Sequence, residues 1–506
     1  MTGTGAAPSG AIDADLVVVG FGPTGATLAG LAALRGLRVV VVERDRELFA
    51  LPRAVQCDHE VLRIIQELGC AEEVVADGVV NEGLDFLAAD RRVLLSFSVP
   101  TLAPTGWPTS VFFHQPTFEA TLRRAVVSLG VEVRLGATVS GLVQHDAGVD
   151  VAVSGAGHLR ARWVVGCDGA RSATRQVIGT SLRDTGFEEE WLVVDLQLEG
   201  AVPGLPSRCL QVCDPSRPHT LVPMPGGRFR FEFMLLAGES ADELLDPATI
   251  RDLVSGWIDP ALARVERAAV YTFHGLVAST WRDRRVFLAG DAAHQTPPFL
   301  GQGMCAGMRD AANLAWKLAA VATGGAPDCL LDTYQAERQP HAQAVIDAAV
   351  EFGRLICLTD PQAAAERDAG LTAARTGTGA GTGGSGAAPN LIPGLARGAA
   401  VGTGGGALSR QPTIDGVRLD DLVGPRAALC TAGPLDPTSP AATWWSAHGV
   451  ALDAVTHPGL APLLEGREAC AIRPDRYVLA RGGVEEVTAV AASVLEGHGA
   501  PVAAGS

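Results

Sequence analysis

Lysine is almost missing from this sequence of 506 residues, in which Lys317 stands alone and arginine supplies the rest of the 40 basic residues. Aspartate and glutamate together number 56, so the formal net charge is −16. A chain this acidic is a poor match for nucleic acid or for an anionic membrane surface, and we expect neither as a partner. The scarcity of lysine beside abundant alanine and glycine is typical of codon bias and says little about function.

Paired cysteines are also lacking. Ten cysteines are scattered without a C-x-x-C pair, and the closest two, Cys209 and Cys213, have no histidine or cysteine cluster beside them. This spacing predicts neither a metal site nor a redox dithiol, and Cys430 and Cys470 are too far apart in the sequence to form a C-x-x-C pair. We therefore expect buried, reduced thiols in a cytoplasmic protein.

One apolar stretch, Leu16–Leu34, contains no charged residue, but it does not predict a signal peptide or a membrane-spanning helix. Gly20, Gly22, Pro23 and Gly25 interrupt it where a spanning helix would be continuous. No basic segment precedes it, and no small-residue cleavage site follows it.

The same stretch predicts a strand, a tight turn and a helix. Leu16–Val19 is short and apolar, as in a buried parallel strand, and G-x-G-x-x-G follows it directly. Of its three glycines, the first allows the turn, the second lets a pyrophosphate approach the backbone, and the third lets helix and strand pack closely. A second apolar run, Arg38–Val42, ends on Glu43, about 20 residues further on, where a carboxylate can bind ribose hydroxyls. These features predict dinucleotide binding.

Composition divides the chain into five parts. Apolar strands alternate with helical patterns at both ends of the first 370 residues, and a mostly β stretch interrupts them. We expect a disordered leader over 1–14, a discontinuous α/β domain over 15–180 and 281–370, a β-sheet domain over 181–280, a Gly/Ala-rich linker over 371–410, and a small α/β domain over 411–506.

Further candidate ligands follow predicted strands or begin helices. Arg53 follows the second strand, near the expected phosphates, and Gln115 begins a helix. Asp168-Gly169 and Gly290-Asp291 each end an apolar strand, where ligands collect in open α/β sheets. A surface arginine, an ordinary helix start and, for Asp168-Gly169, a simple Asp-Gly turn remain the alternatives.

Two more patterns favour a structural role over a functional one. In the segment 228–234 phenylalanines alternate with charged residues, which predicts a half-buried strand. We expect Arg228 and Arg230 on its solvated face, with binding of a substrate carboxylate as the alternative. His294 has no acidic partner evident in the sequence, so we expect a structural role for it.

The glycine turn, Asp168-Gly169 and Gly290-Asp291 together resemble the single-component FAD-dependent aromatic hydroxylases, the class A flavoprotein monooxygenases. Within this class, LPRAVQCDHE, HQPTFE and GDAAHQTPPFLGQGMCAGMRDAANLAWKLA are most similar to the 3-(3-hydroxyphenyl)propionate hydroxylases and to phenol and resorcinol hydroxylases. The resemblance covers about residues 13–355. It implies a Rossmann-like FAD-binding domain, an inserted mostly β substrate domain and a C-terminal thioredoxin-like domain without redox cysteines.

The resemblance also assigns site residues. Asp168 would serve both the FAD pyrophosphate and NAD(P)H, Asp291 the ribityl chain, and Pro298 would lie over the flavin near the phenol. Many relatives carry Leu-Asn in place of Met304-Cys305, so a backbone contact there would be kept and a contact by an asparagine side chain lost. The implied FAD-binding residues are Gly20, Gly22, Pro23, Thr24, Gly25, Glu43, Arg44, Arg53, Gln115, Asp168, Gly169, Gly290, Asp291, Pro298, Gly301, Gly303, Met304 and Cys305.

The activity that the resemblance implies depends on the cofactor. NAD(P)H, with NADPH as the first guess, reduces FAD; O2 then gives a flavin C4a-hydroperoxide, and an electron-rich phenol attacks its distal oxygen. The candidate catalytic residues are Pro298, His114 and His274, with Tyr271 as a further candidate base. We expect no metal, and a homodimer as a possible assembly.

Three other functions remain open. The first is the same chemistry on a polycyclic natural product, either hydroxylation or a Baeyer-Villiger reaction. The second is an FAD-linked oxidase or dehydrogenase, and the third is a flavin-binding module without enzymatic activity.

Overall fold

The computed structural model describes residues 12–47, 53–155, 157–200, 202, 204–376, 393–395 and 402–496. The predicted leader therefore lies outside the described residues except for 12–14, and Ala14 already begins the first strand. Most of the predicted linker, 377–392 and 396–401, also lies outside them. The first residues assigned to the linker, 371–376, continue a helix instead.

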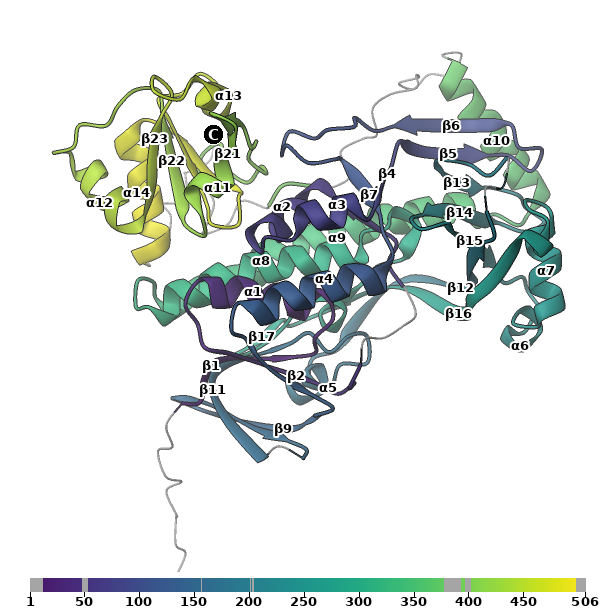
Figure 1. Cartoon of the computed structure of the whole chain (residues 1–506), viewed down its shortest axis with the longest axis horizontal. Helices are drawn as coiled ribbons and strands as arrows, with labels where there is room; N and C mark the ends of the chain where they lie inside the picture. Colours follow the sequence, from purple (N-terminus) through teal and green to yellow (C-terminus); the bar gives the residue numbers. More distant parts are fainter. Residues whose placement is uncertain are drawn as a thin grey trace, which may run out of the picture.

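The first sheet contains the predicted dinucleotide-binding unit, in the lower part of Figure 1. Its strands follow the order β17-β18-β11-β1-β2-β8, and β10 and β9 extend from β11. β1 pairs in parallel with both β2 and β11, and its buried position explains why it reads as a continuous apolar run. The strands are β1 Ala14–Val19, β2 Val39–Glu43, β8 Glu132–Leu135, β9 Val139–His145, β10 Gly148–Val153, β11 Gly157–Gly166, β17 Arg282–Asp283 and β18 Val286–Leu288.

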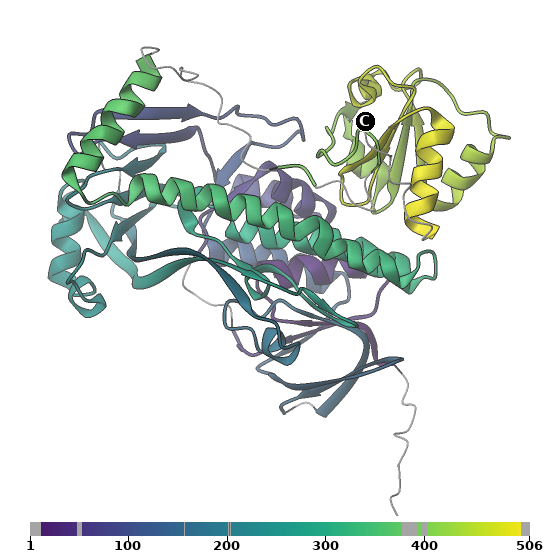
Figure 2. The same ribbon diagram turned by 180° about the vertical axis from the view of Figure 1, so that it is seen from behind.

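Helices cover this sheet and form the main core with it. α1 packs against α4 and α8, whose small residues Ala311 and Ala315 are buried with Ala29 and Ala32 of α1. Figure 2 shows α9 as a long green helix that crosses the back of the molecule between the second sheet and the C-terminal domain. The helices are α1 Pro23–Leu34, α2 His59–Glu67, α3 Ala71–Ala76, α4 Gln115–Ser128, α5 Ala173–Val177, α8 Gly303–Ala322 and α9 Asp332–Ile356. A further helix, α10 Pro361–Thr376, packs against the second sheet instead.

The second sheet, at the right of Figure 1, has eight strands in the order β19-β16-β12-β15-β14-β13-β5-β6. Its phenylalanine face, with Phe229, Phe231 and Phe233, packs against Ile250 and Val254 of a short helix, and the opposite face turns toward the first sheet. The elements are β5 Gly83–Leu87, β6 Val93–Ser98, β12 Leu182–Leu198, β13 Cys209–Val212, β14 His219–Met224, β15 Arg228–Met234, α6 Ala241–Leu244, α7 Pro247–Ser255, β16 Ala263–Ala278 and β19 His294–Gln295.

This sheet extends beyond the boundaries expected for the inserted domain, 181–280. β5 and β6 come from the part assigned to the FAD-binding domain, and β5 pairs in parallel with β13. The strand pattern of 83–98 is visible in the sequence, but the sheet that it joins depends on which edge has unpaired backbone groups, which only the tertiary structure decides.

The C-terminal domain is a four-stranded sheet in the order β23-β22-β24-β25 with helices around it, at the upper left of Figure 1. Cys430 and Cys470 face each other on antiparallel β22 and β24, a proximity that their spacing concealed. Both thiols are free, and burial raises the pKa of Cys430 and raises that of Cys470 to about 11, so both are poor nucleophiles. Its elements are α11 Leu419–Val423, β22 Ala427–Thr431, α12 Pro440–His448, β23 Gly449–Asp453, α13 Ala461–Leu464, β24 Ala469–Ile472, β25 Val478–Gly482 and α14 Val484–Glu496.

Three short strands and one hairpin are the remaining described β elements. The three strands form a separate small sheet in the order β3-β7-β4, and β3 leads directly into helix α2. They are β3 Gln56–Asp58, β4 Val79–Val80 and β7 Ser110–Phe112, and the hairpin is β20 Thr413–Ile414 with β21 Val417–Arg418.

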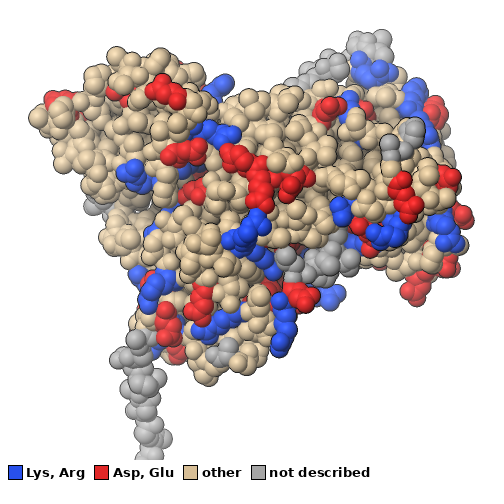
Figure 3. All heavy atoms as spheres, in the orientation of Figure 1, with Lys and Arg blue, Asp and Glu red and all other residues tan. Residues whose placement is uncertain are grey.

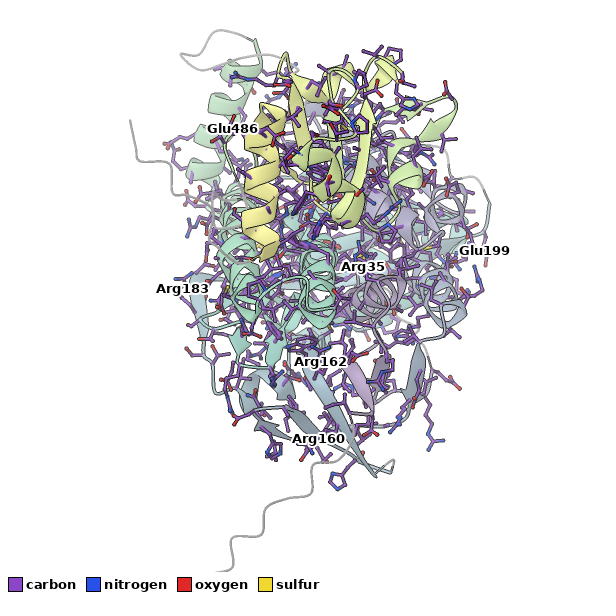
Figure 4. All side chains as sticks on the ribbon, turned by 90° about the vertical axis from the view of Figure 1, so that its left-hand side faces the viewer. Arg35, Arg160, Arg162, Arg183, Glu199 and Glu486 are labelled. Atoms are coloured by element: carbon purple, nitrogen blue, oxygen red, sulfur yellow. The ribbon has the colours of Figure 1, made fainter. Side chains whose placement is uncertain are left out.

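Buried charges join the C-terminal domain to the rest. Arg63 of α2 binds Asp420 through Nε at 2.6 Å and Nη2 at 2.8 Å, and the Tyr477 hydroxyl donates to Glu60 at 2.6 Å. Figure 4 looks onto this side and labels Arg35, which lies below the C-terminal domain and pairs with Glu67 at 2.7 Å. The contacts made by Arg63 and Tyr477 have good geometry and little exposure to water, so they hold the domain in one orientation.

The face drawn in Figure 3 does not have one large patch of a single charge. On the face drawn in Figure 3, acidic and basic side chains are interspersed among neutral ones, and a red group adjoins a blue group near the centre. Across the described part of the chain, no helix has both the length and the apolar character needed to span a bilayer.

Candidate active site

One cavity of about 700 Å³ lies between the two large sheets. The first sheet contributes residues from the turns that follow its strands, such as Gly22 after β1, Cys167 after β11 and Ala289 after β18. The second sheet contributes side chains from β12 to β16. The cavity therefore lies at the carboxyl ends of parallel strands, where open α/β sheets bind ligands.

The glycine turn forms one end of this cavity. Gly20 has φ of 99°, and a Cβ there would lie 2.5 Å from the Cys167 carbonyl oxygen, so only glycine fits. A Cβ on Gly25 would collide with the Gly20 carbonyl oxygen. Gly22, the N-cap of α1, has open space where a Cβ would be. Two glycines thus serve packing, and the third leaves room beside the helix N-terminus for a phosphate.

Glu43 is held by backbone amides at the end of β2. It accepts hydrogen bonds from Phe21 N at 2.6 Å and from Asp45 N at 2.9 Å. Arg44 is exposed and pairs loosely with Asp45 at 3.8 Å. Neither Glu43 nor Arg44 lines the cavity, so any contact with an adenosine ribose lies outside its walls.

The backbone at Arg53 is clamped from two sides. Gln115 Oε1 accepts from Arg53 N at 2.6 Å and from Ala54 N at 2.7 Å, while its amide donates to Glu119 at 2.7 Å. Arg230 Nη1 donates to the Arg53 carbonyl oxygen at 2.7 Å. Arg53 and Gln115 both line the cavity.

The two acid-glycine turns behave differently. Asp168 is engaged in the turn itself, since it accepts from Ser172 Oγ at 2.5 Å, Thr174 N at 2.9 Å and Thr174 Oγ1 at 3.0 Å. Its neighbour Gly169 lines the cavity, whereas Asp168 does not. Asp291 lines the cavity, is half-buried and receives no hydrogen bond from the described residues.

The turn at Gly290 also packs against the glycine turn of β1. A Cβ on Gly290 would lie 2.7 Å from Thr24 Oγ1, and a Cβ on Gly307 of α8 would collide with the same oxygen. Gly290 N donates to Asp310 Oδ2 at 3.1 Å. Thr24 therefore brings α1, the Gly290 turn and α8 into close contact around the cavity.

The segment before α8 forms another wall. Pro298, Gly301, Gly303 and Met304 line the cavity. Cys305 is buried outside the wall, with Sγ 3.8 Å from the Gly301 carbonyl oxygen, and burial raises its pKa. Only the first residue of the Met304-Cys305 pair thus has access to a ligand.

Arg230 corrects a prediction. It is 2% exposed, and its Nε and Nη2 atoms bind Asp195 at 2.6 and 3.0 Å. Arg267 joins the same carboxylate through Nη1 at 3.2 Å and donates to the Tyr271 hydroxyl through Nη2. Arg230 therefore lines the cavity from the charged face of β15, and the backbone at Arg53 contacts it there. The expectation of a solvated face was wrong for Arg230.

The three candidate bases are placed differently. His114 lies outside the cavity wall, where its Nδ1 is 2.9 Å from Thr117 Oγ1, and burial with nearby Arg228 lowers its pKa. His274 and Tyr271 line the cavity. His274 has Glu188 3.9 Å away.

His294 does have an acidic partner. Its Nε2 lies 2.7 Å from Asp310 Oδ2, and Arg338 Nε binds the other oxygen of Asp310 at 2.9 Å. All three are buried outside the cavity wall. The structural role expected for His294 fits this position.

Several polar wall residues had not been singled out from the sequence. Gln211, Thr220, Glu232 and Arg267 line the cavity from neighbouring strands. Asp195 lies behind them and binds Arg230 and Arg267. The alternation in 228–234 was the available signal, because it shows that β15 has a charged face, but it does not show what covers that face.

These features fit FAD. An open glycine cradle at a helix N-terminus suits a pyrophosphate, and an acceptor without a protein partner at Asp291 suits ribityl hydroxyls. No group of three or more histidine, cysteine or acidic side chains in the described ranges is arranged to hold a metal ion.

A family model described as FAD binding domain matches residues 13–349. The chain belongs to this family. The "Probable NADH-specific resorcinol 4-hydroxylase" of Rhodococcus jostii (strain RHA1) is 45% identical over 369 residues, 71% of this chain and 69% of that protein. The "3-(3-hydroxy-phenyl)propionate/3-hydroxycinnamic acid hydroxylase" of Mycobacterium avium (strain 104) is 39% identical over 446 residues, 83% and 76% of the two chains.

Solved structures share the fold of this FAD-binding family member. Aklavinone-11 hydroxylase with FAD and aklavinone superposes with a TM-score of 0.79 at 24% identity, covering 96% of this chain and 99% of that one. The predicted α/β fold class and the assignment as an FAD-dependent aromatic monooxygenase are confirmed. The thioredoxin-like character of the C-terminal domain stays a prediction.

Proposed function

We propose that this FAD-dependent monooxygenase hydroxylates a small phenol and takes its electrons from NADH. The observation that carries the proposal is that one cavity joins the glycine cradle and Asp291 to the polar wall of the second sheet. Cofactor and substrate can therefore lie in contact within one cavity. The relatives named for resorcinol and for a hydroxyphenyl acid support a small phenolic substrate, and the name of the Rhodococcus protein supports NADH over our first guess of NADPH.

The residues around the cradle take the cofactor roles. Bound FAD supplies the redox chemistry by which electrons from the nicotinamide activate O2 for transfer to the ring. Gly22 and the N-terminus of α1 hold the pyrophosphate, and Asp291 accepts from the ribityl hydroxyls. Gln115 acts through the backbone of Arg53, whose position it determines.

The opposite wall holds the phenol. Pro298 and Phe299, from the segment before α8, give apolar contact with a ring, and Tyr271 lies among the polar groups of the second-sheet wall. Because Arg267 donates to the Tyr271 hydroxyl, that hydroxyl keeps its own proton for a hydrogen bond to a substrate oxygen. His274, on the same strand, is the remaining candidate for accepting the phenol proton.

Cytoplasmic location and a homodimer remain part of the proposal. The ten free cysteines support a reducing compartment. Sedimentation of the FAD-loaded protein tests the dimer, and a monomer at micromolar concentration would contradict it.

The function is tested with the purified, FAD-loaded chain. NADH and NADPH oxidation are measured with phenol, resorcinol, 3-(3-hydroxyphenyl)propionate and a polycyclic phenol, with peroxide followed in parallel and 18O2 used to label the product. We expect one simple phenol to stimulate NADH oxidation strongly, with label in the product and little peroxide. Stimulation by the polycyclic phenol alone would favour the natural-product alternative, and oxidation without label would indicate an oxidase.

A further inference from the structure

On the wall of the second sheet, two side chains each have polar atoms that make no hydrogen bond with any described residue. Strand register places Glu232 of β15 between Thr220 of β14 and Val193 of β12, and places Gln211 of β13 opposite Thr220. Gln211, Thr220 and Glu232 therefore form one row across three strands, and all three line the cavity. The neighbouring row contains Arg230.

The cations of this wall already have an acid. Arg230 binds Asp195 with two nitrogens, and Arg267 binds the same carboxylate. Glu232 lies further from these cations, with its Oε1 3.7 Å from Arg230 Nη1. That nitrogen donates its hydrogen bond to the Arg53 carbonyl oxygen and not to Glu232. Asp195 thus neutralises part of the positive charge, and Glu232 adds a second negative group beside it.

Glu232 has no hydrogen-bond donor among the described residues, although it is only 9% exposed. Burial raises its pKa, against the opposing effect of Arg230. Buried carboxyl groups in folded proteins normally have hydrogen-bond partners, because leaving one unpaired is costly. Since Glu232 borders the cavity, a donor on a bound ligand can satisfy it.

Gln211 has an amide donor without an acceptor, the opposite of the situation at Glu232. It is 3% exposed, and its Oε1 accepts from Thr220 Oγ1 at 2.6 Å. Its amide group finds no acceptor in the described part of the chain. An unpaired acceptor and an unpaired donor thus lie in one row on the cavity wall.

A hydroxyl group matches this arrangement because it donates one hydrogen bond and accepts others. We propose that Glu232 and Gln211 bind the second hydroxyl of a neutral dihydroxybenzene, the first hydroxyl being the one on the reacting phenol. This inference rests on the proposed function. It selects against phenols with a carboxylate side chain, because their charge would approach Glu232 while Arg230 and Arg267 are already bound to Asp195.

Equilibrium binding provides the test and does not depend on turnover. The oxidised, FAD-loaded protein is titrated with resorcinol, phenol and 3-(3-hydroxyphenyl)propionate, and binding is followed by the flavin spectrum and by calorimetry. Glu232→Leu removes the acceptor, and Gln211→Met removes the donor. Glu266→Leu is the control, since Glu266 lies on the same sheet, pairs with Arg228 at 2.9 Å and does not line the cavity.

We expect Glu232→Leu to raise the Kd for resorcinol by about 10- to 100-fold, the range for a lost hydrogen bond to a charged group. Gln211→Met has a smaller effect in the same direction. Phenol, which lacks the second hydroxyl, should bind all variants within about threefold, and Glu266→Leu should match the wild type with every ligand. Glu232→Gln, which keeps an acceptor but removes the charge, should improve binding of the propionate relative to resorcinol.

Equal losses for phenol and resorcinol, or no loss for either, would overturn the inference. If Glu232→Leu does not fold or retain FAD, Gln211→Met and Glu232→Gln decide the question alone. Failure of the proposed function has a different signature: no phenol stimulates NADH oxidation by the wild type. A wild type that turns over resorcinol but whose Glu232 variants lose no selectivity would refute the inference and leave the function standing.

Discussion

Glu337 of α9 is the central acid of the interface with the C-terminal domain. Arg473 donates to it through Nη1 at 2.9 Å and Nη2 at 2.8 Å, and Lys317 Nζ and Asn313 Nδ2 each donate at 2.8 Å. Glu337, Lys317 and Arg473 are all fully buried. Glu337→Gln would leave two buried cations short of a counter-charge. Removing one partner of such a pair costs about 3–5 kcal/mol, and because Arg473 keeps Asp475 we expect the lower end.

The pKa of Glu337 leads to a similar value for the loss of stability. Burial alone would raise this pKa, but Arg473 and Lys317 outweigh it and lower the pKa from 4.5 to about 2. A shift of this size corresponds to about 3 kcal/mol of folding free energy. Because the folded-state pKa is the lower one, the stabilisation is present above pH 4.5 and is lost as the pH falls toward 2. The difference in unfolding free energy between wild type and Glu337→Gln should therefore reach its full size at pH 7 and become smaller below pH 4.5.

Urea unfolding followed by tryptophan fluorescence at pH 7 and pH 4 measures the effect. Glu351→Gln is a matched control on the same helix: Glu351 pairs with Arg354 at 2.7 Å, but its side chain is 72% exposed. We expect the control to change the unfolding free energy by less than about 0.5 kcal/mol. A loss below about 1 kcal/mol for Glu337→Gln, or equal effects of the two changes, would refute the reasoning.

Three other predictions concern neighbouring parts of the molecule. Lys317→Met should lower the unfolding free energy in urea by less than half as much as Glu337→Gln does. Burial lowers the pKa of Lys317 to about 8, and without the lysine Glu337 still has Arg473 as its partner. An equal or larger loss of unfolding free energy would contradict this. Asp291→Ala should raise the Kd for FAD by about tenfold or more in fluorescence titrations of apoprotein, since a charged acceptor is lost, whereas exposed Asp328→Ala should not; normal FAD retention would remove Asp291 from the site. Gly307→Ala should destabilise the fold by about 1–3 kcal/mol, because the added methyl group collides with Thr24. Gly370 of α10 is exposed and has open space around it, so Gly370→Ala should stabilise the fold by about 0.5–1 kcal/mol in the same urea experiment.

The sequence alone was sufficient where a local conformation admits few residue types. The turn at Gly20 needs a positive φ and no Cβ, and the strand before it is buried on both faces, so glycine spacing and an apolar run identify the unit. The same holds for the turn that presents Asp291 before α8. Such patterns also carried the resemblance, and the family assignment followed from them.

Tertiary structure decided every feature that depends on what covers a surface. Alternation along β15 showed two faces, but it did not show that the charged face borders a cavity, closed in part by the segment at Arg53, which makes Arg230 and Glu232 part of a wall. Likewise, Cys430 and Cys470 face each other only because β22 and β24 pair, and Lys317 is buried only because the C-terminal domain covers α8. The physical reason is that φ/ψ restrictions act within a few residues, whereas burial and charge pairing join residues that lie hundreds of positions apart.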